Sequence, residues 1–281
     1  MSIAAYDTEI AYAKINLALH VRRRRADGYH DIESVFAFAE DGDVLSAAAR
    51  CDGILTLAIS GPFAAGLDSQ SDNLVLQAGR ALQKHGPAGA GADIHLVKNL
   101  PVAAGIGGGS ADAAATLRLL ARLWSVDTDM QHIAAALGSD VPACLPSRTL
   151  FGTGRGEEID FREIAGLSGS PLLLVNPGKG LSTGPVFAGW DRQDRGVLAA
   201  KNLVDLASDG RNDLYPSAAL LVPEIDDVLR CLSVQPGVTL ARMSGSGATC
   251  FALFESVVAR DAAASALPKQ WWRMATRIRS S

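Results

Sequence analysis

The chain has 281 residues, enough for two domains or one large one; 48% of them are hydrophobic and 20% are charged. These proportions are those of an ordinary globular protein, and they exclude a disordered chain. The formal net charge of −4 shows no basic excess, so we expect neither a nucleic acid nor an anionic membrane surface as a partner.

The cysteines and the N-terminus point to a reducing compartment. Cys51, Cys144, Cys231 and Cys250 are widely spaced, and no two of them form a CxxC pair. No basic segment followed by an apolar one opens the chain, and no apolar run reaches the roughly 18 residues of a membrane span. We therefore expect a cytoplasmic protein.

The first predicted strand covers residues 9–21. Its odd positions from Ile15 to Val21 are apolar, and its even positions include Lys14, Asn16 and His20. This alternation predicts a half-buried strand with a polar face that is available for function. The turn signal Asp27-Gly28 follows it.

Further strands are predicted over residues 34–39, 54–60 and 92–100. A helix is predicted over residues 71–85, where Ser71 or Asp72 caps the start and Gly86-Pro87 ends it.

Four glycines, Gly105 and Gly107 to Gly109, stand directly before an amphipathic helix predicted over residues 110–124. Ser110 occupies the expected N-cap, and Asp112 lies in the first turn. Glycines at a helix N-terminus let backbone N–H groups converge on phosphate oxygens. A tight structural turn and a flexible linker are the alternatives, and the ordered elements on both sides favour the phosphate cradle.

Three common nucleotide-binding patterns do not fit this glycine segment. No lysine follows the glycines as in the Walker A loop, and Ser110 stands where a dinucleotide fingerprint needs its last glycine. The HRD and DFG motifs of protein kinases are also missing.

The second half of the chain mixes short elements without a regular βαβ period, which favours an α+β fold. The domain boundary is expected near residues 150–165, which gives domains over 1–158 and 159–281. Helices are predicted over 128–137, 201–207 and 217–232, and strands over 171–176, 238–243 and 248–254, the last two joined by a tight SGSG loop.

Four segments, in order, resemble the GHMP kinases. PVAAGIGGGSADA is similar to their nucleotide phosphate loop, although PVAAG has alanines where the family often has glycine. GSDVPACL resembles the segment with the catalytic aspartate, and MSGSGATCFALF resembles the third glycine motif. AYAKINLALHV and RADGYHDIESVF resemble the N-terminal signature of one branch, whose members phosphorylate the 2-hydroxyl of a cytidyl methylerythritol in the non-mevalonate route to isoprenoid precursors.

This resemblance implies a two-domain α+β fold. The N-terminal domain would be similar to the second domain of ribosomal protein S5, and the C-terminal domain would be ferredoxin-like. It also implies ATP and Mg²⁺ as cofactors and a small cytidyl alcohol as substrate, with neither nucleic acid nor a membrane as partner. The expected state is a monomer or a weak homodimer.

The resemblance also implies the roles of individual residues. Lys14 and Asp140 would be catalytic, with Asp140 as the base, and Ser110 would lie at the metal. Asn16, Tyr29, His30 and Phe187 would bind the substrate, with the aromatic rings around the cytosine base. The ATP-binding set would be Pro101, Val102, Ala103, Ala104, Gly105, Ile106, Gly107, Gly108, Gly109, Ser110 and Ala111, with Asn73 and Lys98 near the adenine.

Without the resemblance, simpler interpretations are available for the same residues. Asp140 precedes Val141-Pro142 and is suited to capping a helix, and Lys14 alone would be an exposed strand lysine. The basic run Arg22–Arg25 either ends a solvated strand or lies near the substrate's diphosphate. Two other functions remain open: another GHMP kinase, such as a homoserine or mevalonate kinase, and a non-catalytic nucleotide-binding module.

Overall fold

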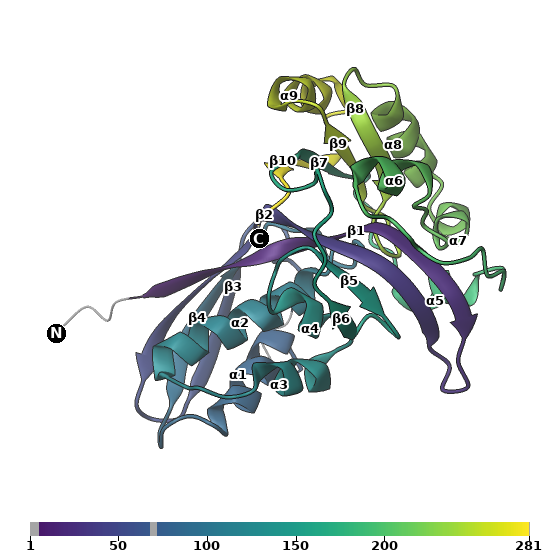
Figure 1. The fold of residues 1–281 in the computed structure, drawn as a ribbon. Helices are drawn as coiled ribbons and strands as arrows, with labels where there is room; N and C mark the ends of the chain where they lie inside the picture. Colours follow the sequence, from purple (N-terminus) through teal and green to yellow (C-terminus); the bar gives the residue numbers. More distant parts are fainter. Residues whose placement is uncertain (1–5, 68–71, 281) are drawn as a thin grey trace. The chain divides into compact units, whose positions relative to one another are not determined.

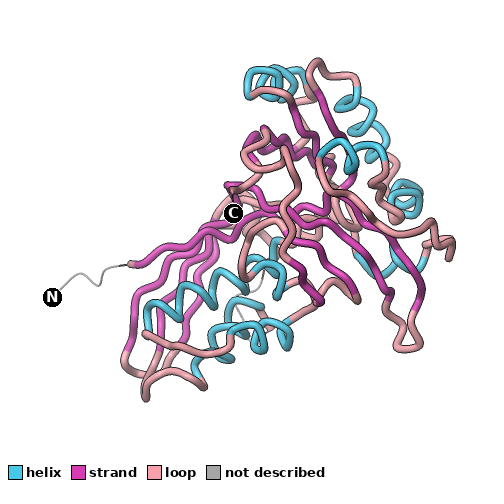
Figure 2. The backbone as a smooth tube through the Cα atoms, viewed as in Figure 1, coloured by secondary structure: helices cyan, strands magenta, loops and turns pink. Residues whose placement is uncertain are grey.

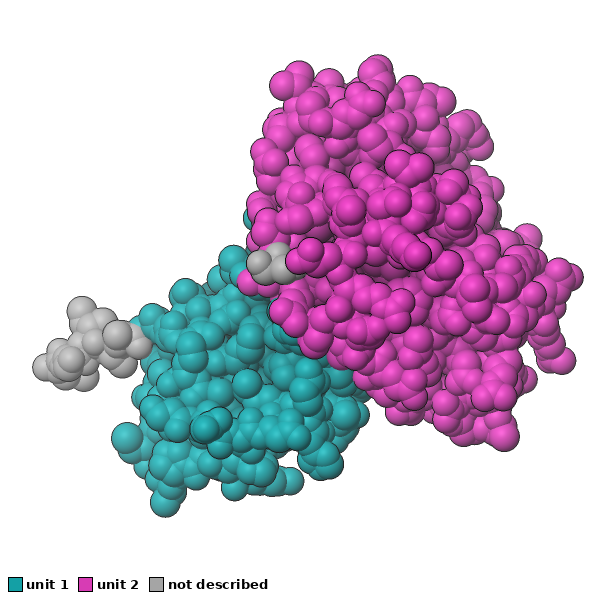
Figure 3. Space-filling model, in the orientation of Figure 1, with its two compact units in different colours: residues 1–13, 41–102, 107–146 teal, residues 14–40, 103–106, 147–281 magenta. Residues whose placement is uncertain are grey.

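The structure is a computed structural model that describes residues 6–67 and 72–280. Helices and strands alternate along the chain without a regular period (Figures 1 and 2). Contacts between residues divide the chain into two compact units, shown in Figure 3. Unit 1 contains residues 1–13, 41–102 and 107–146, and unit 2 contains residues 14–40, 103–106 and 147–281. The domain boundary at residues 158 and 159 remains a prediction.

Two long strands, β1 (Asp7–Arg24) and β2 (His30–Arg50), pair with each other and contribute residues to both units. In unit 1, residues 44–50 of β2 pair antiparallel with β4 (Gly91–Val97), and β4 pairs parallel with β3 (Leu55–Ser60). The helices of this unit are α1 (Leu74–Gln83), α2 (Gly108–Trp124), α3 (Met130–Leu137) and α4 (Val141–Cys144).

In unit 2, the first half of β2 pairs with β5 (Leu150–Thr153), which pairs with β6 (Glu158–Asp160). A second sheet has the antiparallel order β10-β7-β9-β8, formed by β7 (Pro171–Asn176), β8 (Val238–Met243), β9 (Cys250–Phe254) and β10 (Trp272–Arg277). The helices are α5 (Thr183–Ala188), α6 (Leu203–Ser208), α7 (Tyr215–Leu221), α8 (Glu224–Ser233) and α9 (Val257–Ala266).

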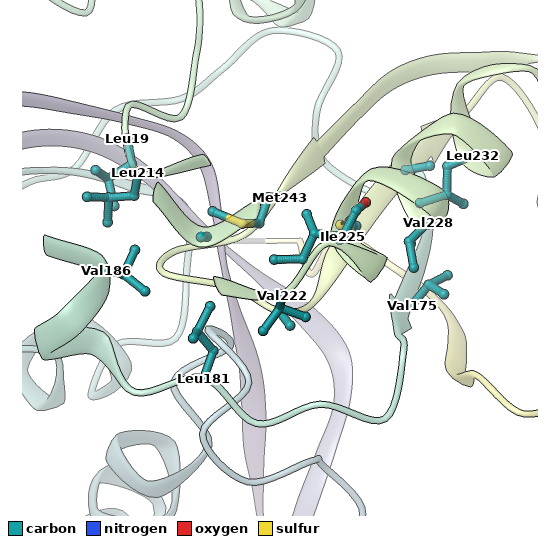
Figure 4. Close-up of a cluster of buried hydrophobic side chains, with 14 of the residues drawn as sticks. Leu19, Val175, Leu181, Val186, Leu214, Val222, Ile225, Val228, Leu232 and Met243 are labelled. Carbon is teal, nitrogen blue, oxygen red and sulfur yellow. Dashed lines mark hydrogen bonds between the residues drawn. The ribbon is translucent and has the colours of Figure 1, made fainter. Parts of the chain in front are cut away.

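An apolar core fills unit 2, and Figure 4 shows part of it. Ile225, Val228 and Leu232 recur along one face of α8 at helical spacing, and all three are buried. They belong to one cluster with Val175 of β7 and Met243 of β8. Burial of this apolar face packs α8 against the sheet, although the first turn of the helix has three acidic residues.

The predicted strand over residues 9–21 lies within β1, but the prediction that it is half-buried is wrong, because its polar face is buried too. Lys14 and Asn16 are 3% exposed, and His20 is fully buried. Residues 211–213 of the same unit lie along β1: Leu19 donates its N–H to the Arg211 carbonyl, and Asp213 donates to the Leu19 carbonyl. The polar side chains of this face of β1 are therefore inside the protein.

The structure also corrects two helix starts. α1 begins at Leu74, and Asn73 caps it by accepting the Val75 N–H at 2.9 Å; Asp72 is not the cap, and Ser71 lies outside the described residues. α2 begins at Gly108, so Ser110 lies within its first turn. The N-cap is Gly107, whose φ of 63° is a left-handed conformation that glycine adopts without steric cost.

The single helix predicted over residues 217–232 is two helices in the structure, α7 and α8. The break falls at Val222-Pro223, because proline lacks an N–H and restricts the residue before it. The strand predicted over residues 34–39 is only part of β2, which runs from His30 to Arg50. The other predicted helices and strands are present, with shifts of a few residues at their ends. The elements that sequence reasoning did not assign are α4, α5, α9, β5, β6 and β10.

Candidate active site

The predicted phosphate loop runs from Pro101 to the start of α2. Its backbone takes positive φ values at three places: 51° at Ala103, 74° at Gly105 and 63° at Gly107. The first N–H groups of α2 follow directly, and the N-cap Gly107 has no side chain that could bond to them. These N–H groups are suited to hold an anion, as predicted for the phosphates of a nucleotide.

Within unit 2, the middle of this loop packs against the second glycine segment, residues 244–247. The Ser244 hydroxyl donates to the Gly105 carbonyl at 2.9 Å, and the Thr249 N–H donates to the Ala104 carbonyl at 3.1 Å. A Cβ on Gly105 would lie 2.5 Å from the Ser244 carbonyl oxygen, closer than atoms can approach. Gly105 is therefore required both for its φ and for this contact.

β1 holds the same part of the loop from its own residues. The Lys14 N–H donates to the Ile106 carbonyl at 3.0 Å, and the Asn16 N–H donates to the Ser244 hydroxyl at 3.1 Å. The Asn16 side chain donates to the Ser34 hydroxyl at 2.8 Å. Lys14 and Asn16, predicted from one strand face, thus lie beside residues 103–106 and the second glycine segment.

Lys14 also contacts an aromatic ring. Its ammonium lies 4.5 Å from the centroid of the Phe36 ring, a cation–π distance. A buried lysine in such a place keeps a positive charge inside unit 2, where an anionic substrate group could use it.

Three of the predicted base-binding residues lie near one another in unit 2. The His30 ring is 5.0 Å from the Phe187 ring and tilted by 36° to it. Tyr29 is 55% exposed, and the Arg155 guanidinium lies 5.0 Å from its ring centroid. Burial, together with the charge of Arg24, lowers the pKa of His30, so its ring favours the neutral form.

Sequence reasoning missed two neighbours of this aromatic group. The Trp190 ring meets His30 edge-on, with centroids 5.7 Å apart, and Arg155 covers Tyr29. Trp190 stands three residues after Phe187, so an aromatic residue at helix-like spacing was a signal that could have identified it. Arg155 carried no comparable signal, because it is brought to Tyr29 only by the pairing of β2 with β5.

The basic run Arg22–Arg25 is largely neutralised within unit 2. Arg22 bonds to Glu33 and Asp194, and Arg25 pairs with Asp27 and Asp31. These contacts favour the solvated strand end over a diphosphate site.

The remaining predicted site residues belong to unit 1. Asp140 is the N-cap of α4, but its side chain makes no capping hydrogen bond. Asn73 has a structural task as the cap of α1. Ser110 lies half-buried in the first turn of α2.

Lys98 is buried between two carboxylates in unit 1. Its ammonium lies 2.5 Å from both Asp43 Oδ2 and Asp112 Oδ2. Burial raises the pKa of Asp112 to about 7, although Lys98 opposes the shift. Burial alone would lower the pKa of Lys98, but the two carboxylates outweigh it and raise the pKa. Sequence reasoning did not connect these three residues.

Comparison with known proteins identifies the family. Residues 73–148 match the GHMP kinases N terminal domain, and residues 196–272 match the GHMP kinases C terminal domain. A relative from Rhizorhabdus wittichii, named 4-diphosphocytidyl-2-C-methyl-D-erythritol kinase, is 55% identical over 282 residues, covering 98% of this chain and 95% of the relative. The chain belongs to the 4-diphosphocytidyl-2-C-methyl-D-erythritol kinase family.

Other similar proteins agree with this family. A 4-diphosphocytidyl-2-C-methyl-D-erythritol kinase from Novosphingobium aromaticivorans is 49% identical, covering 96% of this chain and 92% of the relative. A crystal structure of 4-(cytidine 5'-diphospho)-2C-methyl-D-erythritol kinase matches with a TM-score of 0.82 at 30% identity, over 98% of this chain and all of that one. A homoserine kinase from Cytophaga hutchinsonii shares the fold, with a TM-score of 0.75, at only 16% identity.

Family membership confirms the predicted α+β, two-domain GHMP kinase fold and the prediction of an ATP-dependent small-molecule kinase. In the described part of the chain, no helix combines the length and the apolar character that crossing a membrane requires.

Proposed function

We propose that this kinase transfers the γ-phosphoryl group of ATP to the 2-hydroxyl of 4-diphosphocytidyl-2-C-methyl-D-erythritol, giving the 2-phosphate and ADP, in the non-mevalonate route to isoprenoid precursors. The observation that carries the proposal is the contact of His30 with Phe187, and Tyr29, which precedes His30 in the chain, is exposed. Relatives named for this substrate, at 55% and 49% identity, support it.

The aromatic group is suited to a cytosine base. Aromatic faces stack on a base, and a neutral imidazole can accept or donate a hydrogen bond at the base's polar edge. Tyr29 and Phe187 supply the faces in this proposal, His30 supplies the polar contact, and Asn16 contributes an amide. Arg155 limits the freedom of the Tyr29 ring from one side.

The chemistry assigned to the chain is positioning, charge neutralisation and proton transfer. Asp140 accepts the proton of the substrate hydroxyl as that oxygen attacks phosphorus. Lys14 stabilises the negative charge on the transferred group. The absence of a capping bond from Asp140 to α4 supports a role other than capping.

The phosphate loop, residues 101–111, holds the nucleotide phosphates through its N–H groups in this proposal. Asn73 and Lys98 remain proposed neighbours of the adenine. The described residues contain no cluster of three or more His, Cys, Asp or Glu that could hold a metal. Mg²⁺ commonly uses few protein ligands and the phosphates themselves, so the Ser110 hydroxyl fits it, and the ion would neutralise phosphate charge.

The test is ATP turnover with three alcohols in parallel: the cytidyl methylerythritol, homoserine and mevalonate, each followed by ADP release. Turnover with the cytidyl alcohol alone is expected. Activity only on homoserine or mevalonate would assign the chain to another GHMP kinase, and nucleotide binding without any turnover would support a non-catalytic module.

We also propose that the kinase acts in the cytoplasm, as a monomer or weak homodimer, without a nucleic-acid partner. The net charge of −4 and the four free cysteines support this. Light scattering at several protein concentrations checks the oligomeric state.

A further inference from the structure

A buried group of three charges lies at the base of the phosphate loop. The side chains of Lys98, Asp43 and Asp112 are 4%, 0% and 6% exposed, and the ammonium bonds to one oxygen of each carboxylate. All three residues belong to unit 1. We call them the loop-base cluster.

The cluster holds the chain where it enters the loop. Asp43 Oδ1 accepts the N–H groups of Asn99 at 2.6 Å and Leu100 at 2.8 Å. The Asn99 side chain adds a bond to the Gly42 carbonyl at 3.1 Å. These residues directly precede Pro101, so the entrance of the loop is fixed to β2.

The cluster also holds the chain where it leaves the loop. Asp112 lies in α2, two residues after Ser110, and its bond to Lys98 fixes the first turns of that helix. The Lys98 ammonium lies 3.2 Å from the position that a Cβ on Gly108 would take. The helix therefore starts directly against the ammonium, which would have to shift by a few tenths of an ångström to admit a side chain on Gly108.

Such a cluster is a poor way to gain stability alone. Desolvating three charges costs several kcal/mol per ion, and buried ion pairs often contribute little net stability. Asp112 Oδ1 is buried and has no hydrogen-bond partner among the described residues, which adds to the cost. The cluster instead orders a loop whose two ends meet at one ammonium. A loop that is already ordered loses less conformational entropy when it binds its ligand.

We propose that Lys98, Asp43 and Asp112 are positioning residues that join both ends of the phosphate loop and set its shape for the nucleotide. This proposal rests on the assignment of residues 101–111 to ATP. It gives Lys98 a part in nucleotide binding through its ammonium, without contact between that ammonium and the adenine.

The test compares two substitutions of one residue. Asp112→Leu removes the link to α2 at similar size and leaves Lys98 paired with Asp43, whereas Asp112→Asn keeps an oxygen acceptor for Lys98. We expect Asp112→Leu to raise the KM for ATP and the Kd for a fluorescent ATP analogue about tenfold or more. Asp112→Asn should stay within about threefold of wild type, and both should leave the KM for the cytidyl alcohol within about twofold.

Ile133→Ala, in the core of unit 1 on α3, is the control for lost stability. Assays run well below each variant's melting temperature, and Ile133→Ala should lower that temperature without changing the analogue Kd. If Asp112→Leu cannot be purified folded, Asp112→Ala provides the same comparison. Equal analogue Kd values for wild type and the folded Leu or Ala variant overturn the proposal, as does an equal loss with Asp112→Asn.

The two proposals fail in different ways. Wild-type protein that binds the analogue but turns over none of the three alcohols contradicts the proposed function, while the Kd comparison still decides the role of the loop-base cluster. Wild-type turnover of the cytidyl alcohol, with unchanged analogue Kd in the variants, contradicts the cluster's role alone.

Discussion

Asp140 occupies the N-cap of the short helix α4 without making a capping hydrogen bond to it. In the proposed function this carboxylate is the general base, so replacing it should slow the chemical step. We expect Asp140→Asn to lower kcat about 100- to 10,000-fold, the range typical of a lost general base, and to leave the ATP Kd within about twofold. Steady-state kinetics and binding of a fluorescent ATP analogue measure the two effects. Asp127→Asn, at an exposed position of the same unit, is the control, and wild-type kcat in Asp140→Asn would remove this residue from the mechanism.

The exposed ring of Tyr29 should act on one substrate only. Loss of base stacking costs about 1 to 3 kcal/mol, so Tyr29→Ala should raise the KM for the cytidyl alcohol about 5- to 150-fold with the ATP KM unchanged. Initial rates with each substrate varied in turn give both constants. Tyr6→Ala removes another exposed tyrosine and should change neither. A rise in the ATP KM alone would place Tyr29 at the nucleotide.

Protonation of His30 should make the KM for the cytidyl alcohol depend on pH in a definite direction. Burial and then Arg24 lower its pKa, so the ring is neutral above that pKa and gains a proton as the pH falls through it. The protonated ring has no nitrogen left that can accept a hydrogen bond, so the KM for the cytidyl alcohol should rise as the pH falls below the ordinary range of histidine. His30→Gln should flatten this rise, whereas His85→Gln, at an exposed histidine, should keep it. An identical rise in wild type and His30→Gln would assign the effect to another group.

At the scale of elements, the phosphate loop depends on glycine for two separable reasons. Gly105 has a φ of 74°, and a Cβ there would collide with the Ser244 carbonyl; Gly53 has nearly the same φ, 73°, with nothing within 4 Å of its Cβ position. Alanine at either position would be strained by the positive φ, at a cost of about 1 kcal/mol. Only Gly105→Ala would also produce the steric clash.

Gly105→Ala should therefore raise the Kd for a fluorescent ATP analogue about tenfold or more and lower the melting temperature further than Gly53→Ala does. Gly53→Ala should leave that Kd unchanged. Equal melting temperatures and equal Kd values for the two variants would show that the clash is relieved without moving the loop.

Hydrophobic periodicity predicts most of these elements because each of its signals lies within a few turns of chain. The strand over residues 238–243 and its SGSG loop appear as predicted, and so does the helix ended by Gly138. The loop-base cluster is different, since Asp43 and Lys98 are 55 residues apart and only sheet pairing brings them together. For the same reason, the sequence could name Lys98 but could not find its partners.

At the scale of the whole molecule, stability should depend on burial rather than on hydrophobicity alone. Leu232 of α8 is fully buried, and Leu220 of α7 is 84% exposed. Leu232→Ala should lower the free energy of unfolding by about 2 to 5 kcal/mol, and Leu220→Ala should change it by less than about 0.5 kcal/mol. Urea unfolding followed by circular dichroism measures both, and similar losses would mean that Leu220 is covered in solution.

Burial is also where sequence reasoning about the whole molecule was weakest. Strict alternation in residues 14–21 predicted a half-buried strand, yet Gly196 and Arg211 of unit 2 bond to the His20 ring, which is fully buried. A single strand's pattern cannot reveal a covering segment nearly 200 residues away. The family resemblance nevertheless gave the right fold, because its four motifs lie in the family's order and span most of the chain.

The chain crosses between the two compact units five times, after residues 13, 40, 102, 106 and 146. Neither unit is one continuous stretch, so no single cut separates them. A chimera of two relatives joined at any one point would consequently mix both parents within at least one unit, and the parental side chains there would have to fit each other. Exchanging a whole unit between two such kinases requires a joint at every crossing.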